Sequence, residues 1–135
     1  MIQRLGIASV YVLDQERAKA FYTEKLGFEV RTDVTMGNFR WIEVGPKGQP
    51  DLSITLMAIE AGMKWSKETA DTVRELVKKG TFGFGAFHTD DCRKTYAELK
   101  ARGVVFEGEP QDRPYGVESV FQDDSGNWFA LVQPR

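Results

Sequence analysis

The fold of this chain is decided by the stretch at residues 7–28, which reads IASVYVLDQERAKAFYTEKLGF. Its first seven residues are rich in β-branched and aromatic types, as is typical of a strand, and they lead into Asp14, a residue type that often caps a helix. The apolar residues that follow recur at helical spacing. Gly27 is suited to end the helix, because a residue without a Cβ enters the left-handed region at low cost. The stretch therefore predicts a strand followed by a helix at residues 14–27.

Three further strands are expected in the first half of the chain, at residues 28–34, 40–44 and 52–59. They are separated by turn-forming residues at 36–38 and by a loop containing Pro and Gly at 46–50. The order of elements is therefore βαβββ.

The second half repeats this order, beginning with residues 82–104, FGFGAFHTDDCRKTYAELKARGV. A strand at 82–89 is followed by a cap at Asp90 or Asp91 and a helix that ends at Gly103. Strands are expected at 104–107, 117–122 and 128–133, with a tight turn at 123–127. Asp14 to Asp90 and Gly27 to Gly103 both differ by 76 positions, and a fixed register of this kind indicates an internal duplication.

Residues 61–81 lie between the two repeats, which span residues 1–60 and 82–135 of one predicted domain, 1–135. Ser66 is suited to cap a helix here, and Ala70, Val73, Leu76 and Val77 form a narrow apolar stripe before Gly80. We predict a linker helix on the surface. The alternative is a lid over a pocket.

Composition excludes several classes of function. With 18 basic and 20 acidic residues the net charge is -2, and no dense basic stripe exists, so we expect no nucleic-acid partner. No apolar run is long enough to cross a membrane and no signal-peptide pattern is present, so we expect a cytoplasmic protein. The one cysteine, Cys92, forms no intramolecular disulfide and is interpreted as buried apolar filler.

Three segments resemble the paired modules of the vicinal oxygen chelate superfamily, which contains glyoxalases, bleomycin-resistance proteins and dioxygenases. They are YVLDQERAKAFY and LGF within residues 11–28, TDD and YAELKARGV within 89–104, and PYG and FQDDSGNWFAL within 114–131. The resemblance implies an α+β fold in which two βαβββ modules form a cupped mixed sheet, with each helix on the convex side. It also implies a homodimer, since members of the family typically pair.

Metal-dependent members of that superfamily take ligands from the first and last strands of each module. Carried onto this chain, those positions fall on Ile7, Thr55 (or Met57, if the register slips by two), Phe84 and Ala130. Of these side chains only Thr55 offers an oxygen, and a neutral hydroxyl is a weak ligand. The one histidine, His88, would bind a metal only together with Glu43 or Glu118. We therefore expect no metal and no cofactor.

Alternation along the strands indicates which side chains line the concave side of the sheet. Trp41 and Glu43 lie opposite Ile42 and Val44, and the aliphatic sets are expected to face the helices. The predicted ligand-binding residues are Ser9, Tyr11, Trp41, Glu43, Thr55, Met57, Phe84, His88 and Trp128, with Tyr115 at the rim. A mainly apolar set with a few polar groups is typical of sites for small organic molecules, although each aromatic is also compatible with an ordinary core position.

These observations favour a metal-free protein that binds a small hydrophobic or aromatic molecule in a cup formed with a second subunit. The alternative is a lyase, isomerase or dioxygenase of the same superfamily with a relocated metal site. A third hypothesis, a structural or regulatory role with another partner, requires a packed concave face. No catalytic residue is assigned, because the serines lack a nucleophile motif and the glycines at 80–85 form no phosphate loop.

Overall fold

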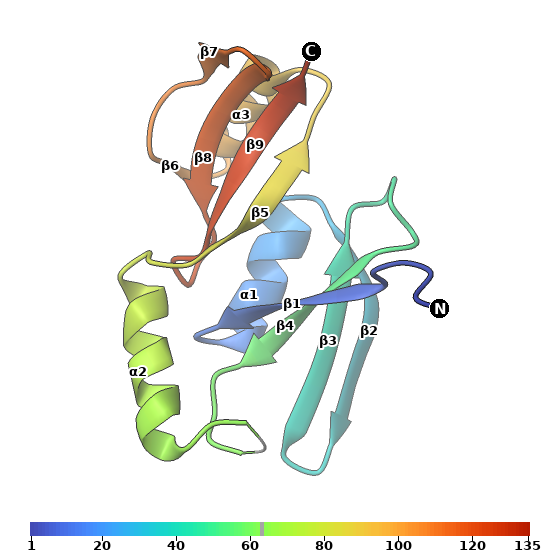
Figure 1. Ribbon diagram of the computed structural model, residues 1–135, viewed down its shortest axis with the longest axis vertical. Coiled ribbons are helices and arrows are strands. Elements are labelled where there is room, and N and C mark those ends of the chain that lie inside the picture. The colour runs from blue at the N-terminus through green and yellow to red at the C-terminus, as the bar shows by residue number, and fades with distance from the viewer. Residues whose placement is uncertain (63) are drawn as a thin grey trace. The chain divides into compact units, whose positions relative to one another are not determined.

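Two β-sheets organise the residues that the computed structural model describes, 1–62 and 64–135. The sheet of the first unit, Met1–Glu75, has the strand order β1-β4-β3-β2. The sheet of the second unit, Leu76–Arg135, has the order β5-β9-β8-β6, with β7 also paired to β8 (Figure 1). The predicted α+β class is confirmed. That the two units form one domain stays a prediction.

The first sheet contains β1 (Ile7–Val12), β2 (Glu29–Met36), β3 (Phe39–Gly45) and β4 (Ser53–Ala58). The first and last of these strands along the chain, β1 and β4, pair in parallel. β4 pairs with β3, and β3 with β2, in the antiparallel direction. Met36 pairs with Phe39, so β2 runs two residues further than expected and the hairpin turn shortens to two residues.

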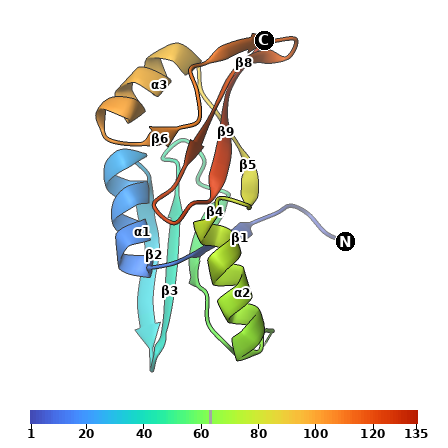
Figure 2. The same ribbon diagram turned by 90° about the vertical axis from the view of Figure 1, so that its left-hand side faces the viewer.

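One face of this sheet packs against the helical segment formed by α1 (Gln15–Ala20) and the π-helical turn η1 (Phe21–Lys25), as Figure 2 shows. Ala18 and Tyr22 are fully buried from the helical side. The sheet residues of that face are Val10, Val12, Ile42, Val44, Ile54 and Leu56, all buried. The predicted assignment of the aliphatic set to the helix is confirmed, and the opposite face is called the distal face below.

Both predicted helix starts and stops are present. Asp14 accepts a hydrogen bond from the N–H of Arg17, Asp91 accepts one from Lys94, and Gly27 and Gly103 have φ of 76° and 92°. The cap of the second helix is Asp91, not Asp90, so the first helical segment contains one residue more than the second. The π turn η1 holds this extra residue, because a wider turn inserts one residue without breaking the helix.

The second unit contains β5 (Gly83–His88), α3 (Cys92–Ala101), β6 (Val105–Phe106), β7 (Gln111–Arg113), β8 (Gly116–Gln122) and β9 (Trp128–Pro134). Sequence reasoning missed β7, whose three residues, Gln-Asp-Arg, carry no strand pattern. The core is aromatic: Phe87 stacks on Phe129 with ring centroids 4.8 Å apart, and Phe121 stacks with both rings, 6.2 Å from Phe87 and 5.6 Å from Phe129. Cys92 is buried as predicted, and burial raises the pKa of its thiol.

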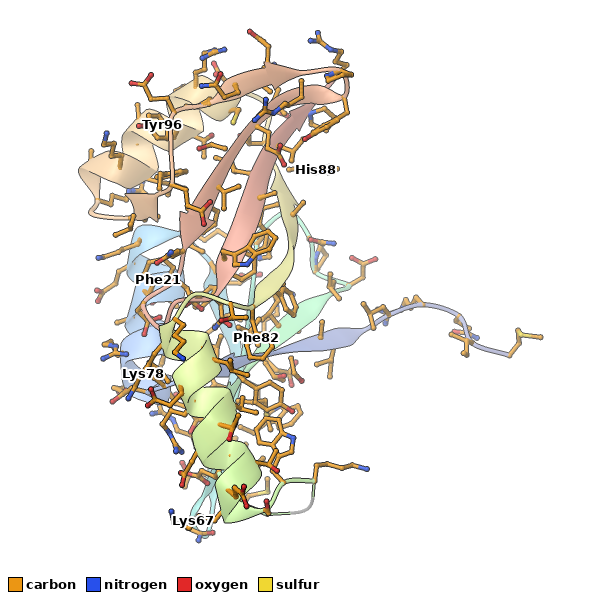
Figure 3. The ribbon with its side chains drawn as sticks, turned by 60° about the vertical axis from the view of Figure 1, so that its left-hand side comes forward. Phe21, Lys67, Lys78, Phe82, His88 and Tyr96 are labelled. Carbon is orange, nitrogen blue, oxygen red and sulfur yellow. The ribbon has the colours of Figure 1, made fainter. Side chains whose placement is uncertain are left out.

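The predicted helix between the repeats is α2 (Lys67–Lys78), whose two ends are labelled in Figure 3. Ser66 caps it, because the Thr69 N–H donates to the Ser66 hydroxyl at 3.1 Å. Ala70 and Val77 are its buried residues. No helix in the described part of the chain is long and apolar enough to span a membrane.

β5 departs from regular alternation. Its parallel pairing with β9 shifts register between Gly83 and Gly85, so Phe84 is an additional residue at a bulge. The Trp128 indole lies directly over Gly83: a Cβ built there would be 2.1 Å from the ring, whereas a Cβ on Gly85 would have no neighbour within 4 Å. The flat packing of Trp128 therefore requires a glycine at position 83.

Gly83→Ala and Gly85→Ala test this packing as a matched pair. Gly83→Ala should lower the free energy of unfolding by about 1–3 kcal/mol, because the new methyl group forces the indole away. Gly85→Ala should change it by less than about 1 kcal/mol, since the methyl group enters open space. Denaturant unfolding gives both values, and equal stability of the two variants would contradict the packing of Trp128 on Gly83.

Candidate ligand-binding site

A hollow of about 350 Å³ opens in the first unit where β3 and β4 separate. The two strands pair only at Glu43 with Thr55 and at Val44 with Ile54, and beyond that point Figure 1 shows them diverging. The hollow is lined by Tyr11, Gln15, Asn38, Phe39, Arg40, Met57, Ala58, Glu60, Ala61, Gly62, Lys64 and Trp65.

Gln15, the first residue of α1, reaches both strands at the point where they separate. Its side-chain amide donates to the carbonyl oxygen of Arg40 on β3 at 2.9 Å and to that of Leu56 on β4 at 2.8 Å. Partly buried carbonyls without a donor are costly, and strands that diverge no longer supply donors to each other. One side chain therefore satisfies both strands and stabilises their separation.

The apolar wall of the hollow is largely aromatic. Tyr11 and Trp65 pack with ring centroids 4.7 Å apart and planes tilted by 47°. Met57 is the cross-strand partner of Tyr11. Phe39 lies on the same hairpin as Trp41, with 6.3 Å between their ring centroids. The hollow thus presents π faces and a thioether beside a few polar groups, a composition typical of small-molecule sites.

Of the two cationic side chains that line the hollow, Arg40 and Lys64, Arg40 is compensated by neighbouring carboxylates. Arg40 donates to both carboxylate oxygens of Asp33, at 2.9 and 2.8 Å, and Lys19 donates to the same carboxylate at 2.7 Å. These bonds, first from Arg40 and then from Lys19, hold the pKa of Asp33 far below its usual range, and Asp33 in turn raises the pKa of Arg40. Glu16 adds a further contact to Arg40 at 3.2 Å. An anionic ligand would therefore compete with carboxylates already in place.

A polar row crosses the distal face next to the hollow. Thr55 pairs with Glu43 on one side and with Ser9 on the other, and its hydroxyl donates to the Ser9 hydroxyl at 2.9 Å. The Trp41 indole N–H donates to the Glu43 carboxylate at 2.7 Å. The six site residues predicted in the first unit, Ser9, Tyr11, Trp41, Glu43, Thr55 and Met57, thus share one face of one sheet, and two of them, Tyr11 and Met57, line the hollow.

The four site residues predicted in the second unit are more scattered. The bulge interrupts the alternation assumed for Phe84, whose ring packs edge-on against the core residue Phe129 at 5.6 Å. His88 is exposed at the end of β5 (Figure 3). The exposed Tyr115 donates its hydroxyl proton to Glu118, which raises the pKa of Tyr115. Trp128 is half-buried over Gly83.

Comparison with known proteins places this geometry in a family. The model of the Glyoxalase/Bleomycin resistance protein/Dioxygenase superfamily matches residues 4–131. The chain belongs to this superfamily. It is also 36% identical over 134 residues to the uncharacterized protein YetH of Bacillus subtilis (strain 168), a match that covers 98% of this chain and 100% of YetH. The resemblance inferred from the three sequence segments is confirmed.

Solved structures with clear sequence identity share the fold. UcmS2 is 48% identical with a TM-score of 0.92, and the match covers 98% of each chain. TnmS3, an antibiotic binding protein from Streptomyces sp. CB03234, is 34% identical with a TM-score of 0.77, covering 99% of this chain and 98% of that one.

The metal positions of the superfamily do not fit a divalent ion here. In the structure Thr55 is the neighbour of Ser9, not of Ile7, and Ala130 is the neighbour of Ala86, not of the bulged Phe84. Two bonded hydroxyls and two methyl groups supply no imidazole or carboxylate. Within residues 1–62 and 64–135, no group of three or more His, Cys, Asp or Glu side chains is arranged to hold a metal ion.

Sequence reasoning missed several residues of the hollow, notably Gln15, Phe39 and Trp65. Gln15 falls on the polar side of a helical pattern, which gives no sign that its amide reaches two strands. Phe39 adjoins a predicted turn. Trp65 lies in the predicted linker, where an isolated large aromatic among polar residues was the one available signal of a contact with the sheet.

Asp33→Asn tests the charge compensation beside the hollow. At pH 7 this change should lower the free energy of unfolding by about 2 kcal/mol, because the carboxylate accepts charge-assisted hydrogen bonds from Arg40 and Lys19. Because the pKa of Asp33 in the folded protein lies below its ordinary value of 3.8, the stabilisation by this carboxylate is present above pH 3.8. It is lost as the pH falls below that value toward the lowered pKa. Unfolding measured from pH 7 to pH 2 should therefore be less pH-dependent in Asp33→Asn.

Asp71→Asn is the matched control, because Asp71 also pairs with two cations but on the exposed surface of α2. Screening by solvent makes such pairs weak, so its effect should be much smaller. An equal effect of the two substitutions on the free energy of unfolding would contradict the inference that the half-buried hydrogen bonds from Arg40 and Lys19 to Asp33 stabilise the fold more than an exposed ion pair does.

Proposed function

We propose that this protein binds a small hydrophobic or aromatic molecule, without a metal ion, in the hollow between β3 and β4 and on the adjoining distal face. The observation that carries the proposal is the tilted pair of Tyr11 and Trp65 beside Met57, at a hollow of about 350 Å³. This volume lies within the range of sites for small organic molecules, roughly 300–1,000 Å³. Trp41, Glu43, Ser9 and Thr55 are the proposed continuation of the site.

Two further observations support binding rather than chemistry. The positions carried over from metal-dependent members of the superfamily, Ile7, Thr55, Phe84 and Ala130, hold no imidazole or carboxylate. TnmS3, which is described as an antibiotic binding protein, is 34% identical to this chain over nearly its whole length. The proposed role is therefore sequestration of a small molecule. Phe84, His88, Tyr115 and Trp128 remain predicted contributors from the second unit.

We also propose a homodimer in the cytoplasm. Several apolar side chains on the distal face of the first sheet are exposed by 41% or more, namely Ile7, Val34, Met36 and Phe39. Apolar side chains grouped on one face are typical of a surface covered by another molecule. A second copy of the chain is the partner expected from the symmetric pairing common among soluble proteins.

Trp65→Ala tests the site. With 2-naphthol as a planar aromatic probe, the substitution should weaken binding about tenfold, because it removes both buried apolar area and a stacking contact. The measurement is the dissociation constant from calorimetric titration, supported by the shifts of the three Trp indole N–H resonances. Trp128→Ala, measured in parallel, tests the predicted contribution of the second unit.

Phe82→Ala is the control, since Phe82 is an exposed aromatic that is not among the residues lining the hollow. Its affinity should stay within about twofold of the unmodified protein. Failure of the unmodified protein to bind the probe saturably, or equal losses in Trp65→Ala and Phe82→Ala, would contradict the proposed site.

Native mass spectrometry of the protein as purified tests the absence of metal and the dimer together. The expected species has twice the mass of the 15.3 kDa chain and no added metal ion. Incubation with zinc, nickel, manganese or iron should leave the mass unchanged and the affinity for 2-naphthol within twofold. A stoichiometric, tightly held ion would favour the metal-dependent enzyme of the same superfamily, and a monomer would refute the dimer.

A further inference from the structure

Gln15 has a side-chain amide whose orientation is determined by its partners. A primary amide carries two N–H donors and one acceptor oxygen. Both donors of Gln15 are used, on the carbonyl oxygens of Arg40 and Leu56. Rotating the amide by 180° would bring its own oxygen against two other oxygens, which is unfavourable. The oxygen, Oε1, is therefore held away from the two strands.

Gln15 and the Tyr11 hydroxyl carry the half-buried neutral side-chain oxygens among the described residues of the hollow, and of the two Gln15 has the acceptor oxygen whose orientation its own hydrogen bonds fix. Within the described residues that line the hollow, Asn38, Glu60 and Lys64 are exposed to water, and the guanidinium of Arg40 is bound to Asp33. Gln15 is half-buried and is neutral. A neutral acceptor that is partly shielded from water contributes more to selectivity than a solvated one, because a ligand that leaves it unsatisfied pays for its desolvation.

We infer that Gln15 Oε1 is a fixed hydrogen-bond acceptor of the site, and that the preferred ligands are planar aromatic molecules bearing an O–H or N–H donor. This inference rests on the proposed function and adds the chemical class of the ligand. The aromatic wall of Tyr11 and Trp65 recognises the ring, and Gln15 recognises the donor on its edge. The two bonds to the diverging strands preorganise the acceptor, so no side-chain freedom is lost when the ligand binds.

A matched pair of probes tests the inference on the unmodified protein. 2-Naphthol has a hydroxyl donor, and 2-methoxynaphthalene has the same ring system with the donor removed. We expect 2-naphthol to bind about tenfold more tightly, the selectivity typical of one partly buried hydrogen bond. Equal affinities would overturn the inference while leaving the proposed binding function intact. Absence of saturable binding by either probe would overturn both.

Two substitutions assign the preference to Gln15. Gln15→Lys retains N–H donors for the carbonyls of Arg40 and Leu56 but has no acceptor, so the tenfold preference should fall to less than about threefold. Gln15→Met removes donors and acceptor together and should also abolish the preference, while retaining affinity for 2-methoxynaphthalene. If Gln15→Met fails to fold, because two carbonyls have lost their donor, the probe pair and Gln15→Lys still decide the question.

Gln3→Lys is the matched control, since Gln3 is an exposed amide of the first unit that is not among the residues lining the hollow. It should retain the full tenfold preference for 2-naphthol. A preference that survives in Gln15→Lys would show that another group accepts the hydrogen bond, and a preference that disappears in Gln3→Lys would show that its loss does not depend on the Gln15 amide; either result would overturn the assignment to Gln15.

Discussion

The separation of β3 from β4 is the constraint on which the candidate site depends. Two adjacent strands normally satisfy each other's backbone groups, so a sheet opens only where another donor replaces the lost ladder. Here the amide of Gln15 bonds the carbonyls of Arg40 and Leu56 just beyond the last paired residues, Glu43 and Thr55. The hollow, its aromatic wall and its charged edge all lie around the point where the Gln15 side chain, in place of a neighbouring strand, supplies the hydrogen-bond donors.

The chain has the superfamily fold, but the side chains carried onto the superfamily's metal positions include no imidazole or carboxylate. In the first sheet Thr55 neighbours Ser9 rather than Ile7, and the two hydroxyls bond each other. In the second sheet the neighbours are Ala86 and Ala130. A scaffold of this kind tolerates the loss because its stability comes from the buried face under the helices, where Ile42, Val44 and Leu56 are fully enclosed.

The two repeats differ by single-residue insertions that their local structures accommodate. The extra residue of the first helical segment lies in the π turn η1, and the extra residue of β5 is Phe84 at a bulge. Each insertion has a local effect, since the caps Asp14 and Asp91 and the closing glycines Gly27 and Gly103 still perform the same roles. At the bulge the exposed Phe84 ring lies edge-on against the core residue Phe129, and Trp128 packs over Gly83.

The amino-acid sequence by itself determined the repeated βαβββ order, the helix ends and the division of β3 into a buried and a distal face, because caps, glycines and alternation are local signals. It also predicted that no metal is bound, because the positions carried over from the superfamily hold no imidazole or carboxylate. Only the tertiary structure decided that Gln15 reaches two strands, that Trp65 from the predicted linker packs on Tyr11, and that Phe84 is the additional residue of a bulge. Those features arise from contacts between segments far apart in the chain and from one bulged residue, neither of which alters a local sequence pattern.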